Sequence, residues 1–132
     1  WITYRDDLKS RCLGVPAQML REHGAVSEVT ARSMAEGALA AAAADYALAV
    51  TGVAGPEGGT PQKPVGRVYV ALSRKGGAAT TVRSFDFPPD RASVRDRSAR
   101  SALQILRFAL LEIADDVVLL WEAPVRDSAA VC

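Results

Sequence analysis

The sequence predicts a single α/β domain in which helices pack on the faces of a mixed sheet. Three observations lead to this prediction: the length, the balance of hydrophobic and charged residues, and the alternation of strand-like and helix-like segments. The 132 residues suffice for one hydrophobic core, and the composition (49% hydrophobic, 23% charged) is that of a globular protein. Helices that connect two strands, followed by a hairpin, favour a sheet with both parallel and antiparallel neighbours.

The N-terminal part predicts a strand and two short helices. Residues 1–4 (Trp-Ile-Thr-Tyr) are apolar, aromatic and β-branched, which is typical of a buried strand. Because domains rarely begin inside such a strand, we expect that sequence is missing upstream. Helices follow over Asp6–Leu13, ended by Gly14, and from Pro16 to about His23.

A longer helix is predicted over residues 28–44, with Ser27 as its N-cap. Its buried face consists of apolar residues at spacings of three and four: Ala31, Met34, Ala35, Ala38, Leu39 and Ala42. Because most of these side chains are small, the helix can pack close to a sheet. The continuous apolar run of residues 47–50 then predicts a central strand.

A hairpin follows a long irregular loop. Residues 53–65 are rich in glycine and proline, which excludes regular structure. Residues 67–73 alternate between apolar and polar side chains and predict a strand, and residues 75–77 (Lys-Gly-Gly) turn the chain into a partner strand over residues 80–87. Two prolines at 88 and 89 end the hairpin.

The last helix is predicted to begin at the cap Asp90 and to run to about Asp116. Its inward side chains are expected to be Val94, Leu103, Leu106, Leu110 and Ile113. Residues 117–121 are predicted either as a further strand or as an extension of this helix. We expect residues 1–121 to form the domain and residues 122–132, which are polar, small and interrupted by proline, to be a disordered tail.

The bulk properties exclude several classes of partner. With 16 basic and 15 acidic residues the net charge is +1, so no global field attracts nucleic acid or an anionic membrane. No apolar run is long enough to span a bilayer, which predicts a cytoplasmic protein. Cys12 and Cys132 lie far apart and form no metal-binding pattern, so we expect two reduced thiols, no metal and no cofactor.

The glycine-rich segment of residues 51–66 is the strongest candidate binding site. It follows a buried strand, which is where α/β sheets place their ligands, and its five glycines allow the backbone to approach a ligand. Free N–H groups in such a loop can bind an anion, and threonine and lysine side chains add donors. The candidate residues are Thr51, Gly52, Ala54, Gly55, Gly58, Gly59, Thr60 and Lys63. Composition alone equally allows a tight connection without a ligand.

Three polar residues at helix ends have competing interpretations. His23 precedes a glycine at a helix end, which favours a structural role with the helix dipole. Ser27 is first a helix cap, although helix N-termini also bind anions. Arg91, at the start of the last helix, is a candidate phosphate ligand. The alternative for Arg91 is a solvated basic face shared with the arginines at 97, 100 and 107.

Several motifs together resemble a known family. They are Trp-Ile-Thr-Tyr at 1–4 with Lys9 five residues on, Leu-Gly-Val at 13–15, His-Gly-Ala-Val-Ser-Glu at 23–28, Met-Ala-Glu-Gly-Ala at 34–38, Thr-Gly-Val-Ala-Gly-Pro at 51–56 followed by Gly-Gly at 58–59, and Lys-Pro-Val-Gly at 63–66. In this order they resemble the C-terminal domain family of the competence/damage-inducible protein CinA, over residues 1 to about 111. Residues 90–95 also resemble the family's Gly-Asp-Arg-x-x-Val-Arg, with Pro89 in place of the glycine.

The resemblance implies a nicotinamide mononucleotide amidohydrolase of pyridine nucleotide salvage, which releases nicotinate mononucleotide and ammonia. It implies that Lys9 is the catalytic base and acid and that Tyr4 orients this lysine or stacks on the pyridine ring. Without the resemblance, an exposed helix-surface Lys9 and a Tyr4 packed at a strand end would be favoured. The family's serine nucleophile belongs to an upstream Glu-Ser-Cys-Thr-Gly-Gly motif that these residues lack.

Three hypotheses therefore stand. In the first, the domain is an amidohydrolase whose serine comes from upstream sequence or from a separate fragment. In the second, it is an inactive remnant that binds the nucleotide through the glycine loop. In the third, it is a structural or oligomerisation module, since family members may be fused behind a molybdopterin-binding-like domain. We expect a homo-oligomer and a small-molecule mononucleotide as ligand.

Overall fold

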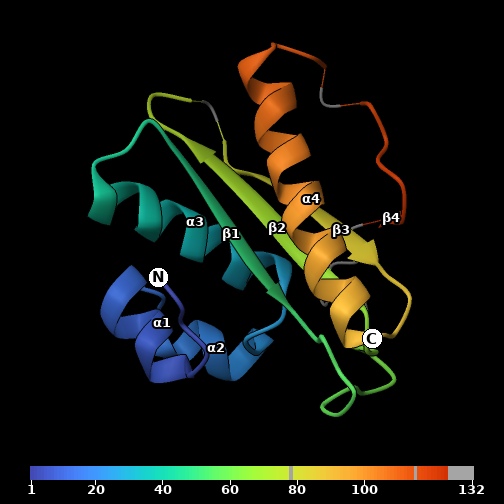
Figure 1. The fold of residues 1–132 in the computed structure, drawn as a ribbon. Coiled ribbons are helices and arrows are strands. Elements are labelled where there is room, and N and C mark those ends of the chain that lie inside the picture. Colours follow the sequence, from blue (N-terminus) through green and yellow to red (C-terminus); the bar gives the residue numbers. More distant parts are fainter. Residues whose placement is uncertain (78, 115, 125–132) are drawn as a thin grey trace, which may run out of the picture.

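The computed structural model describes residues 1–77, 79–114 and 116–124 and shows three layers around one sheet (Figure 1). Three helices come first, α1 (Asp6–Leu13), α2 (Ala17–His23) and α3 (Glu28–Ala42). The strands β1 (Tyr46–Gly52), β2 (Arg67–Arg74) and β3 (Thr81–Asp86) follow, then α4 (Arg91–Leu110) and the short β4 (Glu122–Ala123). α3 covers one face of the sheet and α4 the other, while α1 and α2 pack against α3.

The sheet has the strand order β1-β2-β3-β4, and each neighbouring pair is antiparallel. β2 lies between β1 and β3, with Val50 opposite Val70 on one side and Val70 opposite Arg83 on the other. Seven of its eight residues are buried, because helices cover both faces of this strand. β1 is an edge strand of the described sheet, and its C-terminal end leads into the glycine loop.

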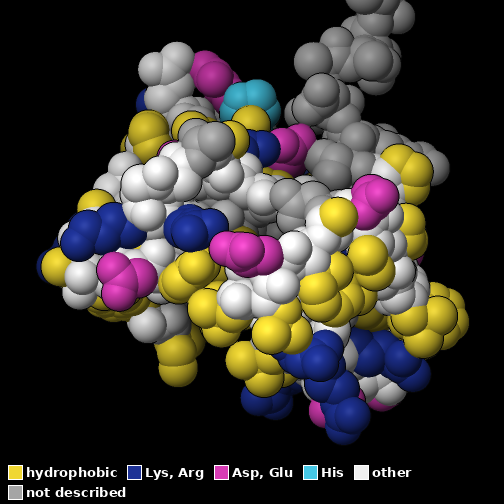
Figure 2. All heavy atoms as spheres, turned by 90° about the horizontal axis from the view of Figure 1, so that it is seen from above, with side chains coloured by type: hydrophobic (Ala, Val, Ile, Leu, Met, Phe, Trp, Pro, Cys, Tyr) yellow, Lys and Arg dark blue, Asp and Glu magenta, His cyan; other side chains and the backbone are white. Residues whose placement is uncertain are grey.

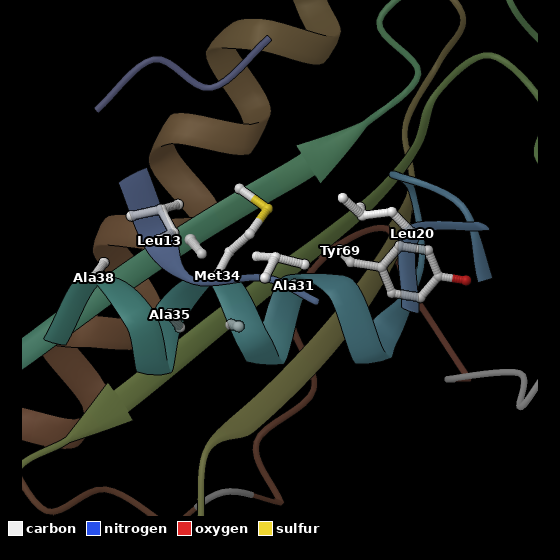
Figure 3. Close-up of a cluster of buried hydrophobic side chains, with 10 residues drawn as sticks. Leu13, Leu20, Ala31, Met34, Ala35, Ala38 and Tyr69 are labelled. Atoms are coloured by element: carbon white, nitrogen blue, oxygen red, sulfur yellow. The ribbon is translucent and has the colours of Figure 1, made fainter. Parts of the chain in front are cut away.

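Two hydrophobic clusters flank the sheet. In the first, small side chains of α3 pack on β1 and β2, and Met34 fills the space toward α1 (Figure 3). Ala31 and Ala35 are fully buried, so the helix axis lies close to the strands, as its alanine content predicts. In the second cluster α4 packs Val94, Ala102 and Ile105 against the opposite face of the sheet.

The helix boundaries of the first half follow their capping signals. α1 carries two acidic residues in its first turn and is capped by Gly14. The φ of Gly14 is 66°, a left-handed backbone conformation that glycine adopts at little cost and other residues do not. Ser27 caps α3 by accepting a hydrogen bond from the Thr30 N–H at 3.2 Å. The predicted bounds of α1 and the predicted cap of α3 are confirmed. α3 ends at Ala42, two residues earlier than predicted.

The predicted fold class, a single α/β domain with helices on the faces of a sheet, is confirmed, but one strand is not formed. Residues 1–4 have no strand structure, and Trp1, Ile2 and Tyr4 are exposed. The parallel pairing expected from that strand is therefore absent from the described residues, whose sheet is antiparallel throughout. For the same reason β1 is an edge strand here, whereas its apolar run predicted a central one.

The last helix differs most from its prediction. α4 ends at Leu110, and Leu103 and Leu110 point to solvent, with 64% and 57% of their surface exposed. The predicted Val94 is buried and Leu106 packs against the core, but the rest of the buried face is formed by Ser98, Ala102 and Ile105. Small residues at 98 and 102 allow α4 to approach the sheet more closely than a leucine stripe would.

After α4 the chain turns back toward the sheet. Glu122 and Ala123 pair with Phe85 and Ser84, so the first two residues of the predicted disordered tail are a strand in the structure. Residues 125–132, the remainder of that prediction, lie outside the described residues, as does Cys132. Within the described part of the chain Cys12 is a free, half-buried thiol. No helix of this part combines the length and apolar character that a bilayer-spanning segment needs.

Candidate active site

A large cavity lies where α1, β1, the glycine loop and the start of α4 meet. It has a volume of about 810 Å³ and is lined by residues 1–4, by residues 48–55 of β1 and the loop, and by two arginines of α4, Arg91 and Arg95. Lys9 of α1 lines the same cavity, as do Glu57 and Gly58. The cavity therefore joins residues that are up to 94 positions apart in the sequence, from Trp1 to Arg95.

Lys9 is a buried cation. Only 5% of its surface is exposed, and its Nζ donates hydrogen bonds to the carbonyl oxygens of Thr3 at 2.9 Å and Tyr4 at 3.4 Å. The carboxylate of Asp6 lies 3.3 Å from the same nitrogen. The interpretation of Lys9 as an exposed helix-surface lysine is wrong, because it shares the buried face of α1 with Leu13.

Tyr4 lines the cavity but lies mostly in solvent. Its side chain is 89% exposed, and its link to Lys9 runs through its backbone carbonyl. The alternative in which Tyr4 packs at a strand end is wrong, because that strand is not formed. The structure brings Tyr4 and Lys9 to one cavity.

The end of β1 and the first half of the glycine loop also line the cavity. Thr51, Gly52, Ala54, Gly55 and Gly58 all line the cavity. The Thr51 hydroxyl donates to the Ala25 carbonyl at 2.7 Å and ties the end of β1 to the segment before α3. Two hydrogen bonds close the neck of the loop, from the Val53 N–H to the Arg67 carbonyl at 2.9 Å and from the Gly66 N–H to the Val53 carbonyl at 2.8 Å.

Arg91 fixes the position of this loop. Its Nη1 donates to the Gly55 carbonyl at 2.8 Å, and Gly55 has a φ of 79°, which an L side chain rarely adopts. The bond connects α4 to the loop across the cavity. Arg91 therefore lines the cavity and is tied to its glycine loop, although the residue is exposed to solvent.

Four predicted binding residues lie outside the cavity. Lys63 reaches away from it and donates to the His23 carbonyl at 2.6 Å, and burial lowers the pKa of its amine. Thr60 forms a tight turn with Lys63 through reciprocal backbone hydrogen bonds of 3.0 and 3.1 Å. Gly59 stands next to this turn, and Ser27 is occupied as the cap of α3. The second half of the loop is thus a structural connection.

Sequence reasoning missed Arg95 as a cavity residue. It lies four residues after Arg91, hence on the same face of α4, and it lines the cavity together with Arg91. That spacing was the signal that could have identified it. With Lys9, Arg91 and Arg95 against Glu57, the charged lining is predominantly positive, which suits an anionic ligand. Among the described residues no group of three potential metal ligands is brought together.

The sequence pattern of the CinA C-terminal domain matches residues 1–110. The chain belongs to the CinA C-terminal domain family. The resemblance found in the sequence motifs is thereby confirmed. A CinA-like protein from Citrifermentans bemidjiense is 52% identical over 110 residues, which cover 83% of this chain and 26% of that protein. One from Anaeromyxobacter dehalogenans is 48% identical over 109 residues, which are 83% of this chain and 26% of that protein.

Solved CinA structures share the fold. A competence/damage-inducible protein from Agrobacterium tumefaciens matches with a TM-score of 0.76 at 40% identity, over 79% of this chain and 63% of that chain. A CinA superfamily protein from Escherichia coli matches with a TM-score of 0.74 at 38% identity, over 80% of this chain and 60% of that one. The chain spans about a quarter of the length of the two CinA-like proteins.

Proposed function

We propose that this CinA domain takes part in hydrolysis of the carboxamide of nicotinamide mononucleotide, which yields nicotinate mononucleotide and ammonia. The observation that carries the proposal is the shared cavity, which is lined both by Lys9 and by the first half of the glycine loop. A cavity of about 810 Å³ is of the size that holds a mononucleotide, and ordinary ligand pockets have about 300–1,000 Å³.

The phosphate is proposed to bind on the α4 side of the cavity. Arg91 is tied to the Gly55 carbonyl by one nitrogen, so its remaining N–H groups are held in a fixed direction. Arg95 stands one helical turn further and adds a second guanidinium. Two arginines present the planar donor sets that suit phosphate oxygens, and this arrangement directs the pyridine ring toward Lys9.

Lys9 is proposed to move the protons of the reaction. A serine Oγ attacks the carboxamide carbon while its proton passes to the neutral amine of Lys9, and the C–N bond then breaks as Lys9 returns a proton to the leaving ammonia. Water hydrolyses the resulting ester. In the structure the Lys9 Nζ donates to the carbonyls of Thr3 and Tyr4, so the proposed proton transfers require Lys9 to exchange one of these acceptors for the reacting group.

The serine is proposed to come from outside residues 1–132, since the family's Glu-Ser-Cys-Thr-Gly-Gly motif does not occur among them. This same observation favours a second candidate function, in which residues 1–132 bind the mononucleotide without turnover. The two candidates agree on binding and differ in the release of ammonia.

The test compares two polypeptides, residues 1–132 alone and the same residues preceded by the serine-containing segment of a CinA-like relative. Calorimetric titration with nicotinamide mononucleotide is expected to show binding by both, and ammonia release only by the extended chain. Turnover by residues 1–132 alone would refute the second candidate. Absence of binding to either polypeptide would overturn both candidates and leave a structural or oligomerisation role.

The role of Lys9 is tested in the extended chain. Lys9→Ala is expected to lower turnover by about 10²–10⁴-fold, the usual contribution of a positioned acid–base group, with binding within a few-fold. Lys75→Ala serves as the matched control, because Lys75 is exposed at the β2–β3 turn, far from the cavity lining. Retained turnover in the Lys9 variant contradicts the proposed role.

A further inference from the structure

A second cavity lies between α4 and the segment that follows it. It has a volume of about 260 Å³ and shares no lining residue with the first cavity. Arg97, Arg100 and Gln104 of α4 form one wall, Leu119 and Trp121 the other, and Phe87 closes the end toward the sheet. The lining contains two arginines and no carboxylate. The wall formed by residues 119–121 lies beyond the residues that match the CinA pattern.

Arg97 is held by an aromatic ring rather than by an acid. Its guanidinium carbon lies 5.4 Å from the centre of the Trp121 ring. No carboxylate of the described residues lies within ion-pair distance of Arg97, whereas Arg100 pairs with Asp96 at 2.8 Å. A guanidinium that stacks on a ring through its face keeps the N–H groups of its edge available, and that edge matches a planar carboxylate.

Trp121 is fixed in an unusual backbone conformation. Its φ is 68°, a region that bulky L residues rarely occupy without compensation from their surroundings. Its carbonyl accepts a hydrogen bond from the Asp86 N–H at 3.0 Å. The next residue, Glu122, pairs with Arg83 at 3.1 Å, and both side chains are mostly buried. The backbone of Trp121 is therefore fixed by the sheet, while its side chain, 43% exposed, faces Arg97.

From these observations we infer that the second cavity binds a small aromatic carboxylate. Its volume of about 260 Å³ lies below the usual range of about 300–1,000 Å³ and suits a molecule of the size of benzoate better than a nucleotide. The carboxylate meets the edge of Arg97, with Arg100 and the Gln104 amide beside it. The ring packs against Leu119 and Phe87. This site is independent of the proposed amidohydrolase reaction.

Tryptophan fluorescence provides a direct test, because the chain has two tryptophans and they line different cavities. In the Trp1→Phe variant the emission reports on Trp121 alone. Titration with benzoate is expected to give a saturable change, with an affinity at least tenfold higher than for benzamide, its uncharged counterpart, because only the anion pairs with Arg97. The same titration of Trp121→Phe, where Trp1 remains, distinguishes binding to the first cavity.

Substitutions on α4 distinguish binding at the second cavity from nonspecific attraction of benzoate by positive charge. Arg97→Gln in the Trp1→Phe background is expected to weaken benzoate binding about tenfold, which is the contribution of one charge-assisted hydrogen-bonded pair. Arg107→Gln removes an equal charge from the same helix outside the cavity and is expected to leave binding unchanged. Equal affinity for benzoate and benzamide, an unchanged Arg97→Gln affinity, or no saturable change up to about 50 mM would overturn the inference.

Discussion

Lys9 illustrates how a small domain can bury a charged side chain. Removing an ammonium group from water is costly unless oxygen acceptors replace its hydration. The carbonyls of Thr3 and Tyr4 and the Asp6 carboxylate provide three such acceptors, and two of them belong to the segment that covers the cavity. The position of residues 1–4 and the burial of Lys9 are therefore coupled, since displacing this segment removes two of the three partners.

Ser27 is expected to act on stability and not on ligand binding. Ser27→Ala removes the acceptor of the Thr30 N–H at a buried position and should lower the free energy of unfolding by about 1 kcal/mol. Urea denaturation measures this change. Ser27→Asn, which can still accept that bond, serves as control. Weaker binding of nicotinamide mononucleotide by correctly folded Ser27→Ala would instead assign Ser27 to the site.

Asp90 makes the start of α4 sensitive to acid. Hydrogen bonds with Ser93 hold the pKa of the Asp90 carboxyl below its ordinary value of 3.8. The folded state therefore binds this proton less readily than the unfolded state, so the contribution to stability is present above pH 3.8 and is lost as the pH falls through the folded-state pKa. An NMR titration of the Asp90 carboxyl carbon should give a midpoint below 3.8. In Asp90→Asn this part of the acid dependence should disappear, and a midpoint at or above the ordinary value contradicts the prediction.

The residues of the cavity were predicted best where the motif is local. Thr51, Gly52, Ala54 and Gly55 continue directly from a strand, so their place at its end follows from the sequence. Lys63 was misplaced because a flexible loop residue can point to either side, and here it bonds to the His23 carbonyl. That choice depends on how α2 packs, which local spacing does not reveal.

At the scale of elements, the contact between α1 and α3 depends on a single glycine. A Cβ built on Gly37 would lie 1.8 Å from the Leu13 carbonyl oxygen, so the two helices touch through backbone atoms. Gly37→Ala should lower the free energy of unfolding by about 1–3 kcal/mol in spite of the better helix propensity of alanine. Chemical denaturation measures the change. Glu36→Ala, at the exposed neighbouring position, should be close to neutral, and a stabilised Gly37→Ala would contradict the close contact.

Helix ends with a local capping signal were predicted well, whereas the end and much of the inner face of α4 were not. The ends of α1 and the start of α3 are specified by a glycine and a serine within the segment itself. In α4 two sets of apolar residues could face the sheet. One contains Val94, Ala102 and Ile105, and the other contains Leu103 and Leu110. Hydrophobicity alone predicts that the leucines are buried, but in the structure the set with smaller side chains packs against the sheet. The edge position of β1 could not be predicted either, because it depends on which strands are present.

At the scale of the whole molecule, apolar side chains remain exposed on α4 and on the segment after it. Leu103, Leu110, Val118 and Leu120 each expose more than half of their surface. Figure 2, which views the end of the molecule where α4 finishes, shows hydrophobic side chains gathered on that face. Patches of this kind commonly mediate association between protein chains.

We expect this surface to make the protein a homo-oligomer. Sedimentation velocity should show a species larger than one chain, and the double variant Leu103→Glu and Leu110→Glu should shift it to the monomer, because charges in an apolar interface remain unpaired. Ala40→Glu with Ala41→Glu adds the same charge at exposed positions of α3 and should not change the distribution. A monomeric parent protein contradicts the expectation.

The closed neck of the glycine loop has an evolutionary consequence. Hydrogen bonds join Val53 to Arg67 and to Gly66, so the chain enters and leaves the loop at one fixed point beside two paired strands. Residues between these positions can be exchanged, lengthened or shortened without shifting the register of β1 on β2. Substitutions in the loop can thus change the ligand specificity of the cavity during evolution while the sheet beneath it keeps its structure.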